Sequence, residues 1–459
     1  MIPNKTTKLR ISMQRGQFSS RLAFVLAASG SAVGLGNIWG FPTNAAENGG
    51  AAFVLMYLIL AFLLAYPALM AELIIGRHTR SNMADALTYI SNSGATKQVG
   101  RLVGFAGMLT ASLILCFYCI VSGWMLGHMI EPVMKFWKMP TWGAWFTEFG
   151  LWRNISLALL FMILTALVIS AGVEQGIEKW SRRLMPSLLA LLVSLIGYVL
   201  LQEGSADGLK HYLVPDFSQM ADPELIVSAL GQAFFSMSLG VGTMLIYGSY
   251  LSSHENITRV GILVTLADTG IAVLAGLLIL PAMFVAQTLG IQVYAESGNL
   301  IAGPDLIFQV LPALFQSMGI GGLLVSFAFF ILLSIAALTS SISMLEVPVS
   351  YAVESHNLNR AHATWIIAIL IFSVSVGICI NFEQTFGLII SITTEWSQPI
   401  LSMFLCLFAG WVFHRQLILA ELQRGNEGVE ATLFWSIWPI YVKFLCPALI
   451  LILVGQKIF

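Results

Sequence analysis

Long, continuous apolar stretches are the feature of this sequence that most restricts its fold. They repeatedly reach the roughly 20 residues that a helix needs to cross a bilayer. A barrel strand is far shorter, about 10 residues, and alternates apolar with polar side chains. Because 58% of the 459 residues are hydrophobic and only 10% are charged, a soluble domain, with about 25% charged residues, does not fit. The chain is therefore predicted to be an all-α membrane protein.

Eleven transmembrane helices are expected from these stretches. Their approximate limits are 20–43, 50–76, 100–131, 154–172, 184–202, 224–251, 258–288, 320–352, 362–380, 387–413 and 432–455. The first stretch does not read as a signal peptide, since it follows a polar tail, contains Asn37 and Pro42, and is longer than the apolar part of such a peptide.

Basic residues are distributed unequally over the segments that connect these spans. With the N-terminus in the cytoplasm, sixteen of the 22 Lys and Arg residues fall on inside segments, five fall outside, and Lys443 lies within the last span. Cytoplasmic loops of membrane proteins carry this excess. The N-terminus is therefore predicted to be inside and, with eleven spans, the C-terminus outside. Four tryptophans around the loop at 132–153 suit the interfacial aromatic belt.

The sequence shows no recognisable enzyme motif. It has no phosphate loop, nucleophile elbow or HExxH zinc motif. Cys116 and Cys119 have CxxC spacing, but they lie on an apolar span without a second pair, which favours packing over metal or redox chemistry. We predict that the protein is not an enzyme.

Glycine pairs interrupt two of the predicted spans. Gly34-Leu35-Gly36 lies in the first span and Gly240-Val241-Gly242 in the sixth, each after small hydroxyl residues. Non-helical backbone at membrane depth is tolerated where it lines a cavity, and such a pair in corresponding positions points to a transporter's binding site. Close helix packing through small residues is the alternative, but it leaves Asn37 and the neighbouring serines unexplained.

Four acidic residues lie within predicted spans, where an ionisable group is costly and is a functional candidate by default. They are Glu72, Asp268, Glu346 and Glu395. Asp268 has no basic residue within a turn or two, so a bound cation is its expected partner; a protonated or amide-paired structural acid is the alternative. Glu72 is expected to organise helix ends. The sequence assigns no role to Glu346 or Glu395.

Hydroxyl residues at 339–341 in the eighth span allow two interpretations. Such hydroxyls often bond back to their own helix. Facing a broken helix, they would instead complete an oxygen cage of the kind that suits a hard cation.

Three segments together resemble the neurotransmitter:sodium symporter family. The run from Arg21 to Gly50 contains SAVGLGNIWGFP and AAENGG, the sixth span contains FFSMSLGVG and the eighth contains ALTSS, in the family's order and spacing. The resemblance covers essentially the whole chain and is closest to bacterial members with eleven spans. It implies the leucine transporter fold, a five-plus-five inverted repeat with broken helices 1 and 6, in the bacterial inner membrane.

The resemblance also implies a division of the chain. Residues 1–19 would form a cytoplasmic tail, and 20–413 the transporter core, with inverted repeats at about 20–202 and 224–413. Residues 414–459 would add a connecting loop and the eleventh helix.

The family's two sodium sites can be carried over residue by residue. Besides the substrate's own carboxylate, the resemblance implies a first site made by the Ala32 carbonyl, Asn37, Ser236 and Asp268. It implies a second site made by the carbonyls of Gly30, Val33 and Ala336 and the hydroxyls of Thr339 and Ser340. The ions expected with the protein are therefore sodium, two in number.

The substrate site implied by the resemblance lies at the same interruptions. The substrate carboxylate would meet the N–H groups of Leu35 and Gly36 and the hydroxyl of Tyr118, and its amine would meet carbonyls near Ala32, Phe235 and Ser236. The side-chain pocket would consist of Ile114, Phe235, Ser238, Val241, Ser340 and Met344.

Two departures from the family pattern bear on mechanism. Chloride-dependent members have an asparagine and, four residues later, a serine where this chain has Asp268 and Ala272. We therefore expect chloride independence, with proton uptake by Asp268 once sodium leaves as a further hypothesis. An outer-gate arginine is replaced by Gly40, with Thr385 opposite, so closure is expected through packing of Trp39, Tyr118 and Phe235 or through Glu383.

The cytoplasmic side keeps the family pattern. Arg15 and Glu354 match its inner gate pair, and Phe18 matches its aromatic anchor. Gly176 and Pro186 match the signature at which the fifth helix can unwind.

The function expected is sodium-coupled uptake of small, hydrophobic or aromatic L-amino acids by alternating access. The partners expected are the amino acid, sodium and the lipid bilayer, with no nucleic acid; a monomer is compatible with the sequence. The alternative is a sodium- or proton-coupled carrier of another amine, nucleobase or osmolyte on the same scaffold, because a fold alone does not settle function.

Overall fold

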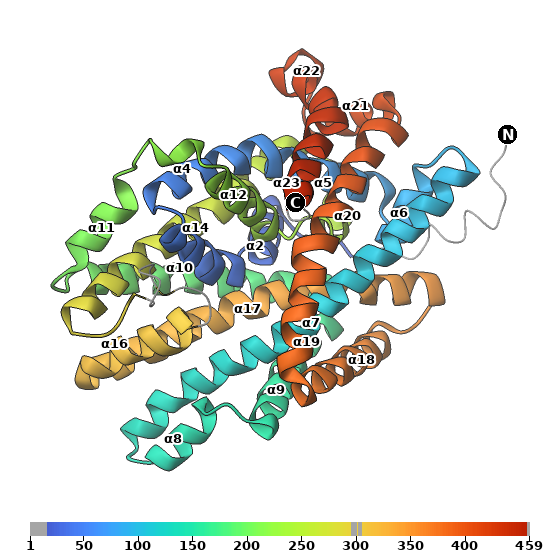
Figure 1. Ribbon diagram of the computed structural model, residues 1–459. Coiled ribbons are helices and arrows are strands. Elements are labelled where there is room, and N and C mark those ends of the chain that lie inside the picture. Colours follow the sequence, from blue (N-terminus) through green and yellow to red (C-terminus); the bar gives the residue numbers. More distant parts are fainter. Residues whose placement is uncertain (1–15, 295–300, 302–304, 457–459) are drawn as a thin grey trace.

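The computed structural model describes residues 16–294, 301 and 305–456, and every regular element in these ranges is a helix (Figure 1). Eight of the described helices are long and apolar enough to cross a membrane, and the number rises to ten if each of two bent helix pairs is one span. The prediction of a helical membrane protein is confirmed.

The helices of the first half, in chain order, are α2 (Arg21–Ala32), η1 (Gly36–Gly40), α3 (Phe41–Glu47), α4 (Ala51–Leu60), η2 (Ala61–Ala65), α5 (Tyr66–Thr79), α6 (Met83–Tyr89), α7 (Gly94–Phe136), α8 (Pro140–Thr147), α9 (Leu151–Ser170), η3 (Val173–Glu178), α10 (Lys179–Leu200), α11 (Ser205–Leu213) and η4 (Gln219–Ala221). Those of the second half are α12 (Pro223–Ser236), α13 (Thr243–Tyr250), α14 (Ile257–Thr288), η5 (Leu306–Val310), α16 (Leu311–Ser317), α17 (Gly319–His356), α18 (Arg360–Ile380), α19 (Phe382–Ile390), η6 (Ser391–Ser397), α20 (Gln398–Leu407), η7 (Phe408–Val412), α21 (Arg415–Gln423), η8 (Val429–Ala431), α22 (Leu433–Ile440), η9 (Tyr441–Leu445) and α23 (Cys446–Gln456).

The first apolar stretch forms two helical pieces rather than one. Ser20 caps α2, which stops at Ala32 because Val33 takes an extended conformation. Helix resumes at Gly36 with η1, a π-helical turn, and continues into α3, and the two pieces meet at a bend of 57°. Pro42 lies in the first turn of α3, directly after the π-helical turn. Backbone groups around 33–36 are thereby left free for other partners.

The sixth apolar stretch is also interrupted, between the end of α12 at Ser236 and the start of α13 at Thr243. Gly240 and Gly242 have φ of 89° and 84°, a left-handed conformation that glycine adopts without steric cost. The side chain of Glu72 on α5 stabilises this turn, since its Oε1 accepts a hydrogen bond of 2.7 Å from the Gly240 N–H. Glu72 thus organises a helix interruption in this structure.

The interrupted segments lie in the middle of the bundle. Helix α2 packs against α10, α13, α14 and α17, while α7 and α17 run along one another past its end (Figure 1). Long continuous helices therefore surround two discontinuous ones, and the irregular backbone is covered on all sides by protein, which is the condition under which it is tolerated at membrane depth.

Several helices extend beyond the limits expected from hydropathy alone. The span predicted at 100–131 lies in α7, which begins at Gly94 after a capping box formed by Ser93 and Thr96. The span at 320–352 lies in α17, which ends only at His356. Hydropathy marks the apolar part of a helix, whereas capping and backbone hydrogen bonds decide where the helix ends.

Candidate functional site

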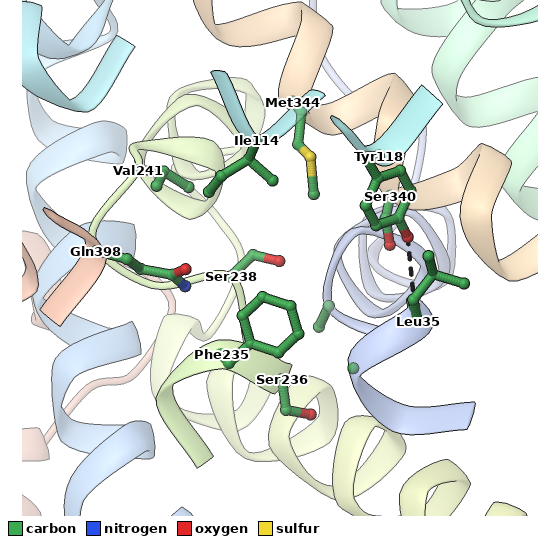
Figure 2. Close-up of a pocket in the computed structure, with 13 residues that line it drawn as sticks. Leu35, Ile114, Tyr118, Phe235, Ser236, Ser238, Val241, Ser340, Met344 and Gln398 are labelled. Atoms are coloured by element: carbon green, nitrogen blue, oxygen red, sulfur yellow. Dashed lines mark hydrogen bonds between the residues drawn. The ribbon is translucent and has the colours of Figure 1, made fainter. Parts of the chain in front are cut away.

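A narrow cavity lies between the two interruptions and helices α7, α17 and α20 (Figure 2). Its lining consists of Ala32, Gly34, Leu35, Gly36, Ile114, Tyr118, Phe235, Ser236, Ser238, Val241, Ser340, Met344 and Gln398. All residues predicted to bind substrate are in this set, so the fold brings together positions that are up to 312 residues apart, from Ala32 to Met344. The volume is about 20 Å³, room for about one water molecule, so side chains must move apart to admit a larger solute.

One end of the cavity is formed by the backbone of the first interruption. The Leu35 N–H donates to the hydroxyl of Tyr118 over 3.3 Å (Figure 2). A side chain at position 34 would not fit, because a Cβ there would lie 2.9 Å from the Tyr118 hydroxyl and closer still to that of Ser340. This end therefore presents backbone N–H groups and a phenol hydroxyl, which are suited to a carboxylate.

An acid–amide–hydroxyl cluster adjoins the cavity through Ser236. The Asn37 amide donates to the Asp268 carboxylate over 2.7 Å and to the Ser236 hydroxyl over 2.8 Å, and Ser236 donates to Asp268 over 2.9 Å. The Asn37 oxygen accepts from the Gly34 N–H over 3.0 Å and so ties the cluster to the interrupted backbone. Asp268, Asn37 and Ser236 are all buried, and a cluster of oxygens with one buried carboxylate is the environment that a hard monovalent cation prefers.

Tyr57 belongs to the same cluster, although no feature of the sequence singles it out. Its hydroxyl lies 3.4 Å from Asp268 Oδ2 and 3.3 Å from the Ser236 hydroxyl. A tyrosine in an apolar helix is most often a packing residue, and only the approach of α4 to α14 and α12 makes it a partner of the acid.

A second oxygen cluster joins α2 to α17. The Ser340 hydroxyl lies 3.2 Å from the Val33 carbonyl, 3.2 Å from that of Ser31 and 3.5 Å from that of Gly30. On the same helix, the Thr339 hydroxyl donates to the Ala336 carbonyl over 3.0 Å. The residues predicted for a second sodium site therefore lie in one place. Thr339 bonds a carbonyl of its own helix, whereas Ser340 faces carbonyls of the broken helix. Each of the two interpretations of these hydroxyls therefore applies to one residue.

The far end of the cavity is mostly apolar, with two polar side chains. Ile114, Val241 and Met344 lie there, and Phe235 lies across the floor (Figure 2). The polar side chains there are Ser238 and, on α20, Gln398, which is 2% exposed and points toward Ser238 (Figure 2). Sequence analysis missed Gln398, whose only signal was an amide inside a predicted span.

An aromatic cluster lies on the α7 side of the cavity beyond Tyr118. Trp124 follows Tyr118 by six residues, about 9 Å along the helix. Phe308 on η5 packs edge-on against Trp39 and Trp124, with ring centroids 6.0 Å and 5.6 Å away. Phe382 and Phe386 on α19 flank Trp124, each with a ring centroid 5.8 Å away. These five residues are called the aromatic cluster below.

Gly40 and Thr385, where the family carries a charged pair, make other contacts. The Thr385 hydroxyl donates to the Asn381 carbonyl of its own chain segment. Gly40 faces Gln232, whose amide donates to the Gly36 carbonyl over 2.7 Å and accepts from Asn44 over 3.0 Å. These bonds fasten α12 to the second piece of the first span without any charge.

The opposite end of the molecule is rich in ion pairs and aromatic contacts. Glu354 accepts from the backbone and side-chain nitrogens of Asn82 over 2.8 Å and 3.1 Å. Its predicted partner Arg15 lies outside the described residues. The Phe18 N–H donates to the backbone carbonyl of Tyr250 over 3.2 Å, and the Phe18 ring packs edge-on against Tyr247. These contacts agree with the prediction that Phe18 anchors the N-terminal tail.

The remaining residues singled out in the sequence lie away from the cavity. Glu346 accepts from Tyr250 and pairs with Arg360. Glu395 is exposed, and Ser391 donates to it over 3.1 Å. The five cysteines are all free thiols and buried. Gly176 lies in the π-helix η3 and Pro186 inside α10.

A helical bundle for the bilayer, with discontinuous helices around a buried cavity lined by backbone and oxygen groups, defines the class of secondary transporters. Comparison with known proteins specifies the family. A profile described as "Sodium:neurotransmitter symporter family" matches residues 15–142 and 127–459.

The relatives agree with this match. The chain is 34% identical over 456 residues to an uncharacterized sodium-dependent transporter, YhdH, of Bacillus subtilis (strain 168), covering 95% of this chain and 96% of that protein. It is 28% identical to a sodium- and chloride-dependent taurine transporter of Bos taurus over 75% of this chain and 61% of that one. The crystal structure of MhsT in complex with L-phenylalanine superposes with a TM-score of 0.81 at 33% identity, covering 97% of this chain and all of that one.

The chain belongs to the sodium:neurotransmitter symporter family. It is a multi-pass membrane protein and a sodium-dependent symporter rather than an enzyme. The family predicted from the three motifs is confirmed, as is the prediction that the chain is not an enzyme.

Proposed function

We propose that the protein couples sodium entry to the uptake of small, hydrophobic or aromatic L-amino acids by alternating access. The observation that carries the proposal is the position of Ser236, which lines the cavity and at the same time bonds Asp268 and Asn37. A substrate carboxylate held by Leu35, Gly36 and Tyr118 would lie beside this cluster and serve as a ligand of the first sodium. Binding of either solute then favours the other, reciprocally.

Two sodium ions per substrate are proposed, one at each oxygen cluster. The first would be held by the Ala32 carbonyl with Asn37, Ser236 and Asp268, and the second by Gly30, Val33, Ala336, Thr339 and Ser340. At about −100 mV and a tenfold sodium gradient, two charges supply roughly 4.6 kcal/mol electrically and 2.7 kcal/mol chemically. This would support concentrating a zwitterion by up to about 10⁵-fold.

Chloride independence follows from the buried carboxylate. Asp268 supplies the negative charge near the first sodium, and Ala272, one turn further along α14, offers no hydroxyl for an anion. When sodium leaves, a bare charge in this dry site is costly, so Asp268 would take up a proton and carry it outward on the return step. Substrate accumulation that is indifferent to pH on both sides would rule out this proton antiport.

The membrane arrangement proposed has eleven spans. The eight continuous helices and the two bent pairs give ten spans, and α12 with α13, counted as one interrupted span, gives the eleventh. The two interrupted spans, α2 with η1 and α3, and α12 with α13, would correspond in a five-plus-five repeat at about 20–202 and 224–413. Residues 1–19 would lie in the cytoplasm, and 414–459 would add the loop and last helix. The charge distribution supports an N-terminus inside, and the apolar helices together with the bacterial relative support a place in the bacterial inner membrane.

The aromatic cluster is the proposed outer gate. It joins the first span, α7, η5 and α19 by ring packing, at the place where the charged pair of other family members is absent. The inner gate proposed is Arg15 with Glu354.

The proposed substrate class is supported by the cavity and by one relative. A charged side chain would be left unpaired among Ile114, Val241 and Met344, which is costly. MhsT was crystallised with L-phenylalanine, which suits an apolar pocket on the same fold.

The decisive experiment is binding of a panel of L-amino acids to the purified protein, in sodium and in potassium, with and without chloride. We expect tight binding of a hydrophobic or aromatic amino acid that disappears in potassium and does not depend on chloride. Binding that persists without sodium would contradict the coupling. Sodium-dependent binding of a decarboxylated analogue would favour the alternative, a carrier of another amine, nucleobase or osmolyte.

A further inference from the structure

Gln398 presents an unsatisfied hydrogen-bonding group inside the cavity. Its amide nitrogen reaches the Phe234 carbonyl only at 3.5 Å, and its Oε1 is buried without a hydrogen-bond partner in the part of the chain that the structure describes. A buried acceptor without a partner is destabilising, and such groups are rare unless a ligand or water completes them.

The local backbone directs this side chain toward the cavity. Gln398 is the first residue of α20 and follows the π-helix η6. Short π-helical insertions are frequent at functional sites, and the extra residue in the turn shifts the direction of the side chains that follow. The preceding Ser397 is fixed by a hydrogen bond of 2.7 Å to Thr110 on α7. The Gln398 carbonyl also lies close against Gly240, where no Cβ would fit.

The position of Gln398 relative to the substrate gives it a role. Figure 2 shows it on the side of the cavity opposite Leu35 and Tyr118, with Ser238 and Phe235 between them. A substrate held at its carboxylate by Leu35 and Tyr118 would extend its side chain past Phe235 toward Gln398.

We infer that Gln398 is a specificity-determining residue that selects amino acids whose apolar side chain carries an O–H or N–H donor at its far end, as the phenol of tyrosine or the indole of tryptophan does. The inference rests on the proposed function and adds the substrate class to it. A donor on the substrate would hydrogen-bond to Gln398 Oε1, whereas a purely apolar side chain would leave this oxygen without a hydrogen bond.

The test compares substrates that differ in the donor alone. Binding to the full-length protein is measured in sodium for tyrosine against phenylalanine and for tryptophan against benzothienylalanine, in which sulfur replaces the indole N–H. In the unmodified protein, the donor-bearing member of at least one pair is expected to bind about ten-fold more tightly or better. In Gln398→Met, an apolar change of similar size, that ratio should fall to about one.

The matched control is Gln384→Met, the same substitution at an exposed position on α19, which should leave the ratio unchanged. Equal affinities within both pairs in the unmodified protein would overturn the inference even if Gln398→Met did not fold. A donor preference that survives in Gln398→Met would also overturn it. Failure of the proposed function looks different, since phenylalanine itself would then show no sodium-dependent binding.

Discussion

A single carboxylate sets the ion chemistry proposed here. Asp268 is buried, and the groups that bond it, Asn37, Ser236 and Tyr57, are neutral. A neutral cage around one negative charge attracts a cation and leaves no requirement for an added anion. The effect of removing that charge can therefore be predicted.

Asp268→Asn should weaken sodium binding, because asparagine keeps the shape of the side chain but not its charge. We expect the half-saturating sodium concentration for substrate binding to rise about ten-fold or more in chloride-free buffer, equivalent to at least ~1.4 kcal/mol. Adding Ala272→Ser should make the protein respond to chloride. Asp207→Asn, at an exposed acid on α11, is the control, and an unchanged sodium dependence in Asp268→Asn would contradict the assignment.

Two adjacent serines on α17 allow a matched test of the second oxygen cluster. Ser340 faces the carbonyls of Val33 and Gly30, whereas Ser341 bonds Leu338 and Thr165 on the other side. Ser340→Ala should raise the half-saturating sodium concentration about ten-fold, because it removes an ion ligand. Ser341→Ala should leave sodium dependence nearly unchanged. Equal effects of the two substitutions would indicate general destabilisation instead of ion coordination.

At the scale of elements, interruption of two helices creates the site. Neither half of the first span is long, and the backbone between the halves bonds side chains: the Leu35 N–H donates to Tyr118 and the Gly34 N–H to the Asn37 side chain. The continuous helices α7, α14 and α17 hold these partners in place. Alternating access needs such a site to be held at the centre while one part of the bundle rocks against the other.

The loop helix η5 should control release to the outside. Phe308→Ala removes the ring that packs against Trp39 and Trp124, and each aromatic pair contributes about 0.5–1.5 kcal/mol beyond burial. We expect bound amino acid to dissociate about ten-fold faster in constant sodium. Phe315→Ala, in the neighbouring α16, removes a buried ring that packs on Phe329 and serves as the control. Identical dissociation rates in the two variants would exclude a gating role for Phe308.

At the scale of the whole molecule, orientation follows from charge rather than from packing. The loop that contains Ser218 is predicted outside, and the loop that contains Glu427 inside; both residues are exposed. With all five native cysteines buried, Ser218→Cys should react with a membrane-impermeant thiol reagent on intact cells. Glu427→Cys should react only after permeabilisation. The reverse pattern would invert the proposed topology.

Much of the fold and of the candidate site could be predicted from sequence. Hydropathy indicates a helical membrane protein, because in lipid a chain must satisfy its backbone groups internally. The glycine interruptions and Asp268 mark the site, because irregular backbone and a charge at membrane depth both need a reason. The residues predicted to bind substrate lie around one cavity, since motif and position in the span specify them together; that they bind substrate stays a prediction.

Tertiary structure alone decided the rest. Tyr57 meets Asp268, Phe308 covers Trp39, and Gln398 enters the cavity because separate helices approach one another there. None of these residues stands in a distinctive local pattern, and each would read as ordinary packing or as an incidental polar residue in an apolar helix. The sequence by itself determined that the helices lie in lipid, that two of them are interrupted at glycines and that Asp268 is a buried charge, because these are local properties. Which side chain completes a site depends on distances between helices, and only the folded bundle sets these.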